Sequence, residues 1–151
     1  MSQVVDGNLE YMVGKSGNYL TKRKKTILDV YAPSVESNAI VLTEDMTGRI
    51  VVLPDASAGD ADVITLPATP ASGTYFKFLV GVDLTQNFVM AGVFEGGCSA
   101  AGGYEDLAAT TSITFTKTKA KAGDYLNCMY HDGKWYVDGI ATTAGSYVPA
   151  S

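Results

Sequence analysis

Few residues of this 151-residue chain could do acid–base or nucleophilic chemistry. The single histidine, His131, comes directly before Asp132-Gly133, a pair typical of tight turns. A general base at the tip of a hairpin would lack both an orienting partner and a cleft. The sequence also holds no Gly-x-Ser-x-Gly nucleophile motif. We therefore expect no enzyme activity and no catalytic residue.

Candidate metal and cofactor ligands are equally sparse. Asp55, Asp60 and Asp62 share one loop and could hold calcium, although loops of this composition usually only turn the chain. One histidine and two separated cysteines are too few for a structural zinc site. The glycines between residues 96 and 103 match no phosphate-binding spacing. We expect no metal and no cofactor.

The charge of the chain is low and unevenly distributed. Charged residues make up 18% of the sequence, and the net charge is −5. Residues 1–35 carry five basic and three acidic groups, a net +2, whereas residues 36–151 carry six and thirteen, a net −7. A basic arm on an acidic body fits an arm that docks on an acidic protein surface, including a second copy of the body.

The basic cluster Lys22-Arg23-Lys24-Lys25 could touch nucleic acid. A single short cluster on an acidic protein more often docks on protein, so no nucleic-acid partner is expected. A disulfide between Cys98 and Cys128 is possible, but two cysteines in a chain of this size favour free thiols. No signal peptide is visible and no stretch approaches the ~20 apolar residues of a membrane span, so we expect assembly in a cytoplasm and no membrane partner.

The segment 123–139 predicts two strands joined by a type I′ turn at Asp132-Gly133. The turn fixes the register, in which Tyr130 faces Trp135 and Cys128 faces Val137. Tyr75, Trp135 and Tyr136 could form a sugar platform, but this register assigns Trp135 to the core. The predicted core face holds Leu126, Cys128, Tyr130, Trp135 and Val137, and the opposite face Asn127, Met129, His131, Lys134, Tyr136 and Asp138.

Residues 1–37 show neither helical nor long strand periodicity. We interpret them as an extended arm that becomes ordered by contact with a partner; the alternative is an ordinary N-terminal strand pair packed on its own body. The residues expected at a partner interface come from this arm and from the polar face of the hairpin: Tyr11, Tyr19, Lys22, Arg23, Lys24, Lys25, Tyr31, Met129, His131 and Tyr136.

The remaining chain predicts short strands separated by Gly and Pro turns. We expect strand 74–82 to form a hairpin with 87–91, and 92–111 to be a long connection with a helical turn only at 104–108. Alternation places Phe76, Phe78, Val80, Ile113 and Phe115 in the core. The predicted fold is all-β: a small antiparallel β-sandwich or barrel, jelly-roll-like, with an arm (1–37), a body (38–141) and a small polar tail (142–151) that Tyr147 and Val148 could anchor.

Several motifs come in an order that resembles capsid decoration (cement or auxiliary head) proteins of tailed bacteriophages. They are Thr47-Gly48, Ile50-Val51-Val52-Leu53, Ile64-Thr65-Leu66-Pro67, Gly73-Thr74-Tyr75-Phe76-Lys77-Phe78, Gly123-Asp124 and Asp132-Gly133-Lys134-Trp135-Tyr136-Val137. The resemblance covers about residues 40–140 and leaves the arm unmatched.

The resemblance implies a compact β module on the capsid exterior that clamps neighbouring major capsid subunits and forms a homotrimer. The implied partners are the major capsid protein and further copies of this chain, after assembly in the cytoplasm of a bacterial host. The alternative function is a phage fibre, tail or neck module that binds a host-surface glycan.

Overall fold

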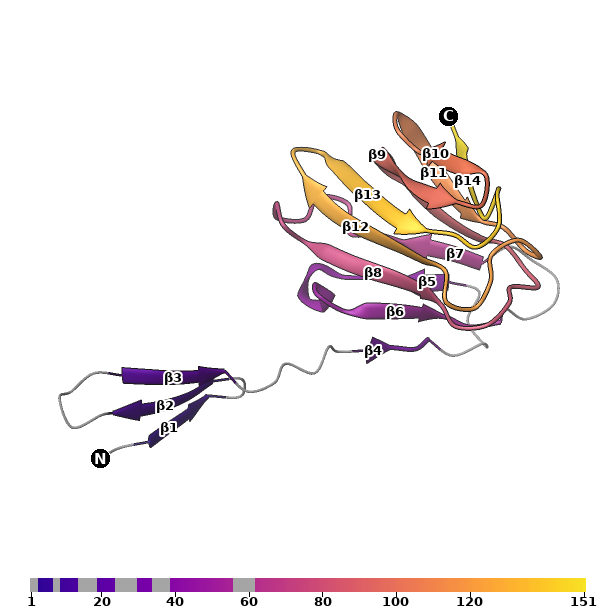
Figure 1. The fold of residues 1–151 in the computed structure, drawn as a ribbon. Coiled ribbons are helices and arrows are strands. Elements are labelled where there is room, and N and C mark those ends of the chain that lie inside the picture. Colours follow the sequence, from indigo (N-terminus) through magenta and orange to yellow (C-terminus); the bar gives the residue numbers. More distant parts are fainter. Residues whose placement is uncertain (1–2, 7–8, 14–18, 24–29, 34–38, 56–61) are drawn as a thin grey trace.

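The computed structural model describes residues 3–6, 9–13, 19–23, 30–33, 39–55 and 62–151, with side chains described from residue 30 onward. The regular secondary structure of the described residues is all β, apart from one short 3-10 helix at Glu44–Met46. Strands β1 (Gln3–Asp6), β2 (Leu9–Val13) and β3 (Tyr19–Arg23) form an antiparallel sheet of their own (Figure 1). Eleven further strands form one mixed sheet that folds into two layers.

The front layer of Figure 1 contains β4 (Val30–Tyr31), β6 (Ile50–Leu53), β8 (Tyr75–Val80), β12 (Tyr125–His131) and β13 (Lys134–Ile140). The back layer contains β5 (Ala39–Val41), β7 (Asp62–Thr65), β11 (Thr110–Phe115) and β14 (Tyr147–Ala150). From β4 to β9 the chain alternates between the layers. As a result β4, β6 and β8 pair in parallel in front, and β5, β7 and β9 pair in parallel behind.

Strand β9 (Phe88–Ala100) joins the two layers. Its first half pairs with β7 and β11 of the back layer, and its second half pairs with β13 of the front layer and with β10 (Gly103–Asp106). The register against β11 shifts between Thr110 and Ser112, which is where the two halves meet. Such irregularities let one strand pass between the sheets of a sandwich.

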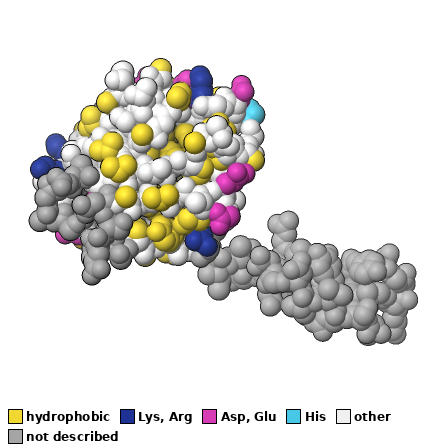
Figure 2. Space-filling model, turned by 180° about the vertical axis from the view of Figure 1, so that it is seen from behind, with side chains coloured by type: hydrophobic (Ala, Val, Ile, Leu, Met, Phe, Trp, Pro, Cys, Tyr) yellow, Lys and Arg dark blue, Asp and Glu magenta, His cyan; other side chains and the backbone are white. Residues whose placement is uncertain are grey.

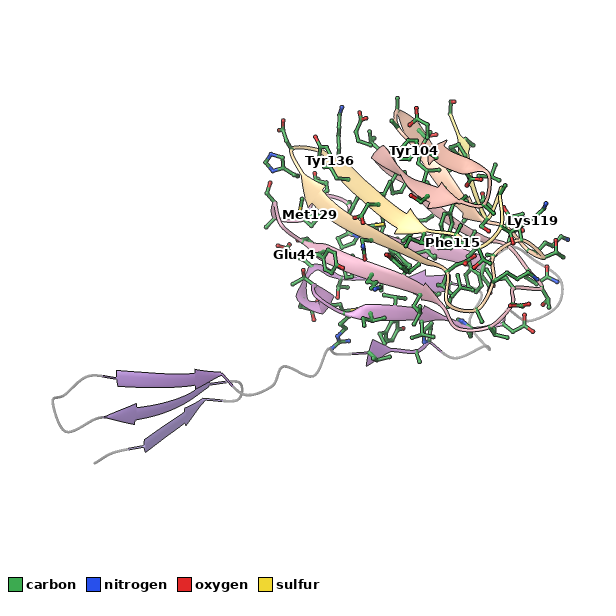
Figure 3. All side chains as sticks on the ribbon, viewed as in Figure 1. Glu44, Tyr104, Phe115, Lys119, Met129 and Tyr136 are labelled. Atoms are coloured by element: carbon green, nitrogen blue, oxygen red, sulfur yellow. The ribbon has the colours of Figure 1, made fainter. Side chains whose placement is uncertain are left out.

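Aromatic side chains fill the space between the layers. The Phe78 ring of β8 lies 6.0 Å from the ring of Phe115 on β11, which Figure 3 labels. The Phe115 ring lies 5.1 Å from that of Tyr147 on β14. The Phe76 and Trp135 rings are 6.0 Å apart. All but one of the residues expected in the core are buried: Phe76, Phe78, Val80, Ile113, Phe115, Leu126, Cys128, Trp135 and Val137. The exception is Tyr130, which is partly buried and packs against the core.

The closing hairpin of β12 and β13 has the register that the turn predicts, with Tyr130 opposite Trp135 and Met129 opposite Tyr136. Asp132 and Gly133 have φ angles of 47° and 80°, as a type I′ turn requires. At the other end of the hairpin, buried Asp124 accepts hydrogen bonds from the Lys121 and Thr142 backbone N–H groups (2.9 and 2.8 Å) and from the Thr142 hydroxyl (2.6 Å). This carboxylate therefore joins the segments that enter and leave the hairpin.

The all-β sandwich is confirmed, but three finer predictions are wrong. The pairing is mixed rather than antiparallel, because the chain alternates between layers. Strand β8 pairs with β6 and β12 rather than with residues 87–91. The segment 92–111 is the second half of β9, a turn, β10 and the start of β11, with no helical turn at 104–108.

The glycines of β9 explain the last of these errors. A Cβ at Gly96 would lie 2.2 Å from the Val137 carbonyl oxygen of β13, and one at Gly97 would lie 2.3 Å from the Glu105 carbonyl oxygen of β10. Glycines that resemble loop residues in the sequence are therefore the residues that let β9, β10 and β13 approach closely.

The two ends of the chain contribute strands to the described structure. Within the segment interpreted as an arm, β1–β3 form the separate sheet, whereas β4 pairs with β6 of the body and Tyr31 packs against the core. The arm's contact with a partner stays a prediction. In the tail, β14 pairs with β11, and Tyr147 is buried.

Candidate interaction surfaces

The titratable side chains considered for catalysis do not converge. His131 is exposed on β12 beside the turn, and its ring lies 6.4 Å from that of Tyr136. Cys128 is buried on the opposite face of the same strand. Within the described part of the chain, no three His, Cys, Asp or Glu residues lie close enough to bind a metal ion together.

Both cysteines are buried free thiols. Burial raises the pKa of the Cys98 thiol to about 12, with a further contribution from Glu105, whose carboxylate lies 3.8 Å from the sulfur. Burial also raises the pKa of the Cys128 thiol well above its ordinary value. Because the thiolate is the reactive form, these side chains serve as small hydrophobic residues of the core.

The acidic loop considered for calcium is described only at its ends. Asp55 accepts hydrogen bonds from the Thr85 hydroxyl (2.5 Å) and backbone N–H (3.4 Å), so it fastens this loop to the one after β8. Asp62 is buried at the start of β7, and burial raises the pKa of its carboxyl group. Asp60 lies outside the described residues.

The outer surface of the back layer carries no charged side chain on its strands. Register and alternation place two rows of side chains there. We call this surface the charge-free face; its residues are Ala39, Val63, Val89, Thr114 and Val148 in one row and Val41, Thr65, Ala91, Ser112 and Ala150 in the other. Figure 2 shows hydrophobic side chains spread over this side of the molecule and the Lys, Arg, Asp and Glu side chains mainly around its rim.

Three valines of the charge-free face are well exposed: Val41 by 56%, Val63 by 45% and Val148 by 44%. Five strands about 4.8 Å apart make the face about 20 Å wide, so its area is a few hundred Å². That size is typical of the largest apolar patch on a monomeric protein, and such patches are often functional. The register brings ten uncharged side chains together on this surface, so the face is a candidate contact surface for another protein.

The outer surface of the front layer holds a groove with a volume of about 320 Å³. Tyr75 of β8, Met129 of β12 and Tyr136 of β13 lie in one row across three neighbouring strands. Met129 and Tyr136 are 46% and 42% exposed, and Figure 3 shows them on adjacent strands. We call this site the tyrosine groove; it is lined by Tyr75, Asn127, Met129, Tyr136, Val137 and Asp138.

A chain of hydrogen bonds runs along the tyrosine groove. The Tyr75 hydroxyl donates to Asn127 Oδ1 at 3.0 Å, and Asn127 Nδ2 donates to Asp138 Oδ2 at 3.1 Å. Burial, followed by the nearby Asp138 carboxylate, raises the pKa of the Tyr75 hydroxyl, which keeps it in the protonated, donating form. The chain fixes the orientation of the Asn127 amide and of the Asp138 carboxylate.

The expected interface residues fall into separate groups. Met129, His131 and Tyr136 lie together on the outer surface of the hairpin. Tyr31 is partly buried against the core. Tyr11, Tyr19, Lys22 and Arg23 belong to β2 and β3, whose side chains lie outside the described part, as do Lys24 and Lys25.

Sequence reasoning missed the charge-free face altogether. Its signal was present as small or β-branched residues at alternate positions, such as Val63 and Thr65, with no charge among them. Collecting those positions into one surface required the order of five strands, which is non-local information.

No helix in the described residues is long and apolar enough to cross a bilayer. Neither the models of known protein families nor the sequences of curated proteins match this chain. The resemblance to phage capsid decoration proteins therefore stays a prediction.

Proposed function

We propose that this chain is a structural virion protein that binds the outer surface of a phage capsid and stabilises contacts between major capsid subunits. The observation that carries the proposal is the charge-free face, an uncharged surface of small and β-branched side chains on one side of the sandwich. The order of motifs that resembles decoration proteins supports the same assignment.

The chemistry of the charge-free face suits contact between proteins. Small side chains such as Ala91 and Thr65 let another backbone or sheet approach closely, and no charge has to be desolvated when the face is covered. The body outside this face is acidic, which disfavours close contact between arbitrary surfaces of like charge. Covering this face therefore carries little electrostatic cost.

The size of the face predicts how binding is organised. A few hundred Å² per copy is below the roughly 800 Å² per partner of a standard stable interface. A single body would therefore bind weakly, and a homotrimer would bind far more tightly because its three faces engage together. Arm contacts from residues 1–37 would add to this area.

Co-sedimentation with capsid shells assembled from the major capsid protein of the same virus tests the proposal. The native chain should sediment with the shells in a saturable way. Val63→Lys places a charge on β7 within the charge-free face and should abolish most of the binding, whereas Val82→Lys, at an exposed valine after β8, should leave it intact. Absence of binding by the native chain, or equal binding by both variants, would reject the proposal.

A fibre, tail or neck module that binds a host-surface glycan is the second candidate function. The tyrosine groove favours it, because exposed aromatic side chains there flank an oriented amide and carboxylate. Trp135, considered for the same platform, is 3% exposed and belongs to the core. A glycan array probed with the native chain and with Tyr136→Ala tests this second candidate: shell binding without glycan binding excludes it.

A further inference from the structure

We infer that the tyrosine groove is a subsite for one or two rings of an uncharged carbohydrate. The inference does not depend on capsid binding, because the groove lies on the front layer and the charge-free face lies on the back layer. A molecule held through its back layer would leave the groove open to solvent. The two surfaces can therefore be occupied at the same time.

The walls of the groove match the apolar face of a sugar ring. Tyr136 and Met129 are directly opposite each other on β13 and β12, and nearly half of each side chain is exposed. The face of an aromatic ring carries partial negative charge, which attracts the polarised C–H groups of a pyranose. The volume of about 320 Å³ is at the lower end of the range of about 300–1,000 Å³ for small-molecule sites, which suits a ligand of monosaccharide or disaccharide size.

The polar side chains of the groove match the hydroxyl groups of a sugar. The Asp138 carboxylate accepts one hydrogen bond from Asn127 and is exposed, so it retains acceptor capacity for two neighbouring hydroxyls. The hydrogen bond from Tyr75 to Asn127 holds the amide in place before a ligand arrives. Pre-oriented polar groups reduce the entropic cost of binding a flexible, hydrated ligand.

The charge of the groove favours a neutral ligand over an anion such as phosphate, because Asp138 is the charged side chain of its lining. Lys77, Asn127 and Asp138 are neighbours across β8, β12 and β13, so one positive and one negative charge flank the central amide. The Lys77 ammonium lies 4.2 Å from the centre of the Tyr125 ring, on the same layer. Lys77 thus lies beside the groove rather than in its lining, whereas Asp138 in the lining would repel an anionic ligand and can accept hydrogen bonds from sugar hydroxyls.

Nuclear magnetic resonance titration of the full-length protein tests the inference. The probes are the methyl glycosides of glucose, galactose, mannose and N-acetylglucosamine, each at concentrations up to tens of millimolar. We expect at least one of them to shift the backbone signals of Met129, Tyr136 and Asp138 with a Kd in the millimolar range. Signals of the charge-free face should not move.

Matched variants make the titration specific. Tyr136→Ala and Asp138→Asn should each weaken binding by roughly tenfold or more, because one removes the stacking wall and the other the charged acceptor. The controls Tyr104→Ala, an exposed tyrosine on β10 outside the groove (Figure 3), and Asp132→Asn, in the hairpin turn, should change Kd by less than about twofold.

Two results would overturn the inference. The first is that none of the four glycosides moves the groove signals although the spectrum shows a folded protein. The second is that binding survives both Tyr136→Ala and Asp138→Asn, or is lost equally in the controls. The Tyr136→Ala variant should bind capsid shells as well as the native chain does. A negative sugar titration would therefore reject the carbohydrate subsite without rejecting capsid binding.

Discussion

A pair of glycine substitutions tests how β9 connects the two layers. Gly96 and Gly102 both have positive φ angles, 110° and 106°. A Cβ at Gly96 would lie 2.2 Å from the carbonyl oxygen of Val137 on β13, whereas a Cβ at Gly102, in the turn before β10, would meet nothing within 4 Å. The two alanine variants therefore share a backbone penalty and differ in the clash with the neighbouring strand.

The expected magnitudes follow from that geometry. An L-residue in a left-handed conformation costs about 1–2 kcal/mol, of which about 0.4–1 kcal/mol is offset by the reduced entropy of the unfolded chain. Gly102→Ala should therefore lower the free energy of unfolding by about 1 kcal/mol. Gly96→Ala must also move β9 away from β13 by close to 1 Å. Forced repacking of this kind costs about 1–3 kcal/mol more.

Urea denaturation followed by tryptophan fluorescence measures both variants, because Trp135 pairs with Phe94 next to this contact. In a thermal melt of a chain of this size, a difference of 1–3 kcal/mol corresponds to a difference in Tm of about 2–12 °C. Equal destabilisation by the two substitutions would show that β9 and β13 are not in close contact at Gly96. The described junction between the layers would then be wrong.

Three further predictions concern the body and its ends. Asp124→Ala should lower the free energy of unfolding by about 2–4 kcal/mol in a denaturant titration, because three donors lose a buried charged acceptor. The thiol of Cys98, with its pKa raised to about 12, should react with a thiol reagent only after unfolding. The thiol ionises near pH 9 in the unfolded chain but only near pH 12 in the folded one. The contribution of the buried Cys98 thiol to the free energy of unfolding should therefore be complete below pH 9 and decline as the pH rises towards 12. Deletion of residues 1–23 should leave the Tm of the body unchanged, whereas deletion of 1–37 should lower it by removing β4 and the packing of Tyr31.

The sequence was sufficient to predict local features of the fold. Asp132-Gly133 sets a turn whose register assigns every side chain of β12 and β13 to a face, and the observed pairing of Met129 with Tyr136 follows that register. The alternation of β8 likewise separates Phe76 and Phe78 from the outer surface. These features depend on residues close together in the chain, so the local pattern contains the necessary information.

Non-local features were missed for a physical reason. Strands β6 and β8 pair in parallel, as do β7 and β9, because the chain forms a strand of the other layer between the two partners. Neither partner strand contains a sequence signal for this alternation between layers. Gly96 and Gly97 resemble loop residues until the neighbouring carbonyl groups are in place. Tyr75 completes the tyrosine groove only because β8 pairs with β12, and the charge-free face exists only once five strands are aligned.

The thermal stability of the capsid shell tests the central claim most directly. Shells of the same virus that lack this protein are heated alone, with a saturating amount of the native chain, and with the Val63→Lys variant. We predict that the native chain raises the shell melting temperature and that Val63→Lys does not, because its charge lies in the charge-free face. An unchanged shell melting temperature in the presence of the folded native chain would contradict the claim.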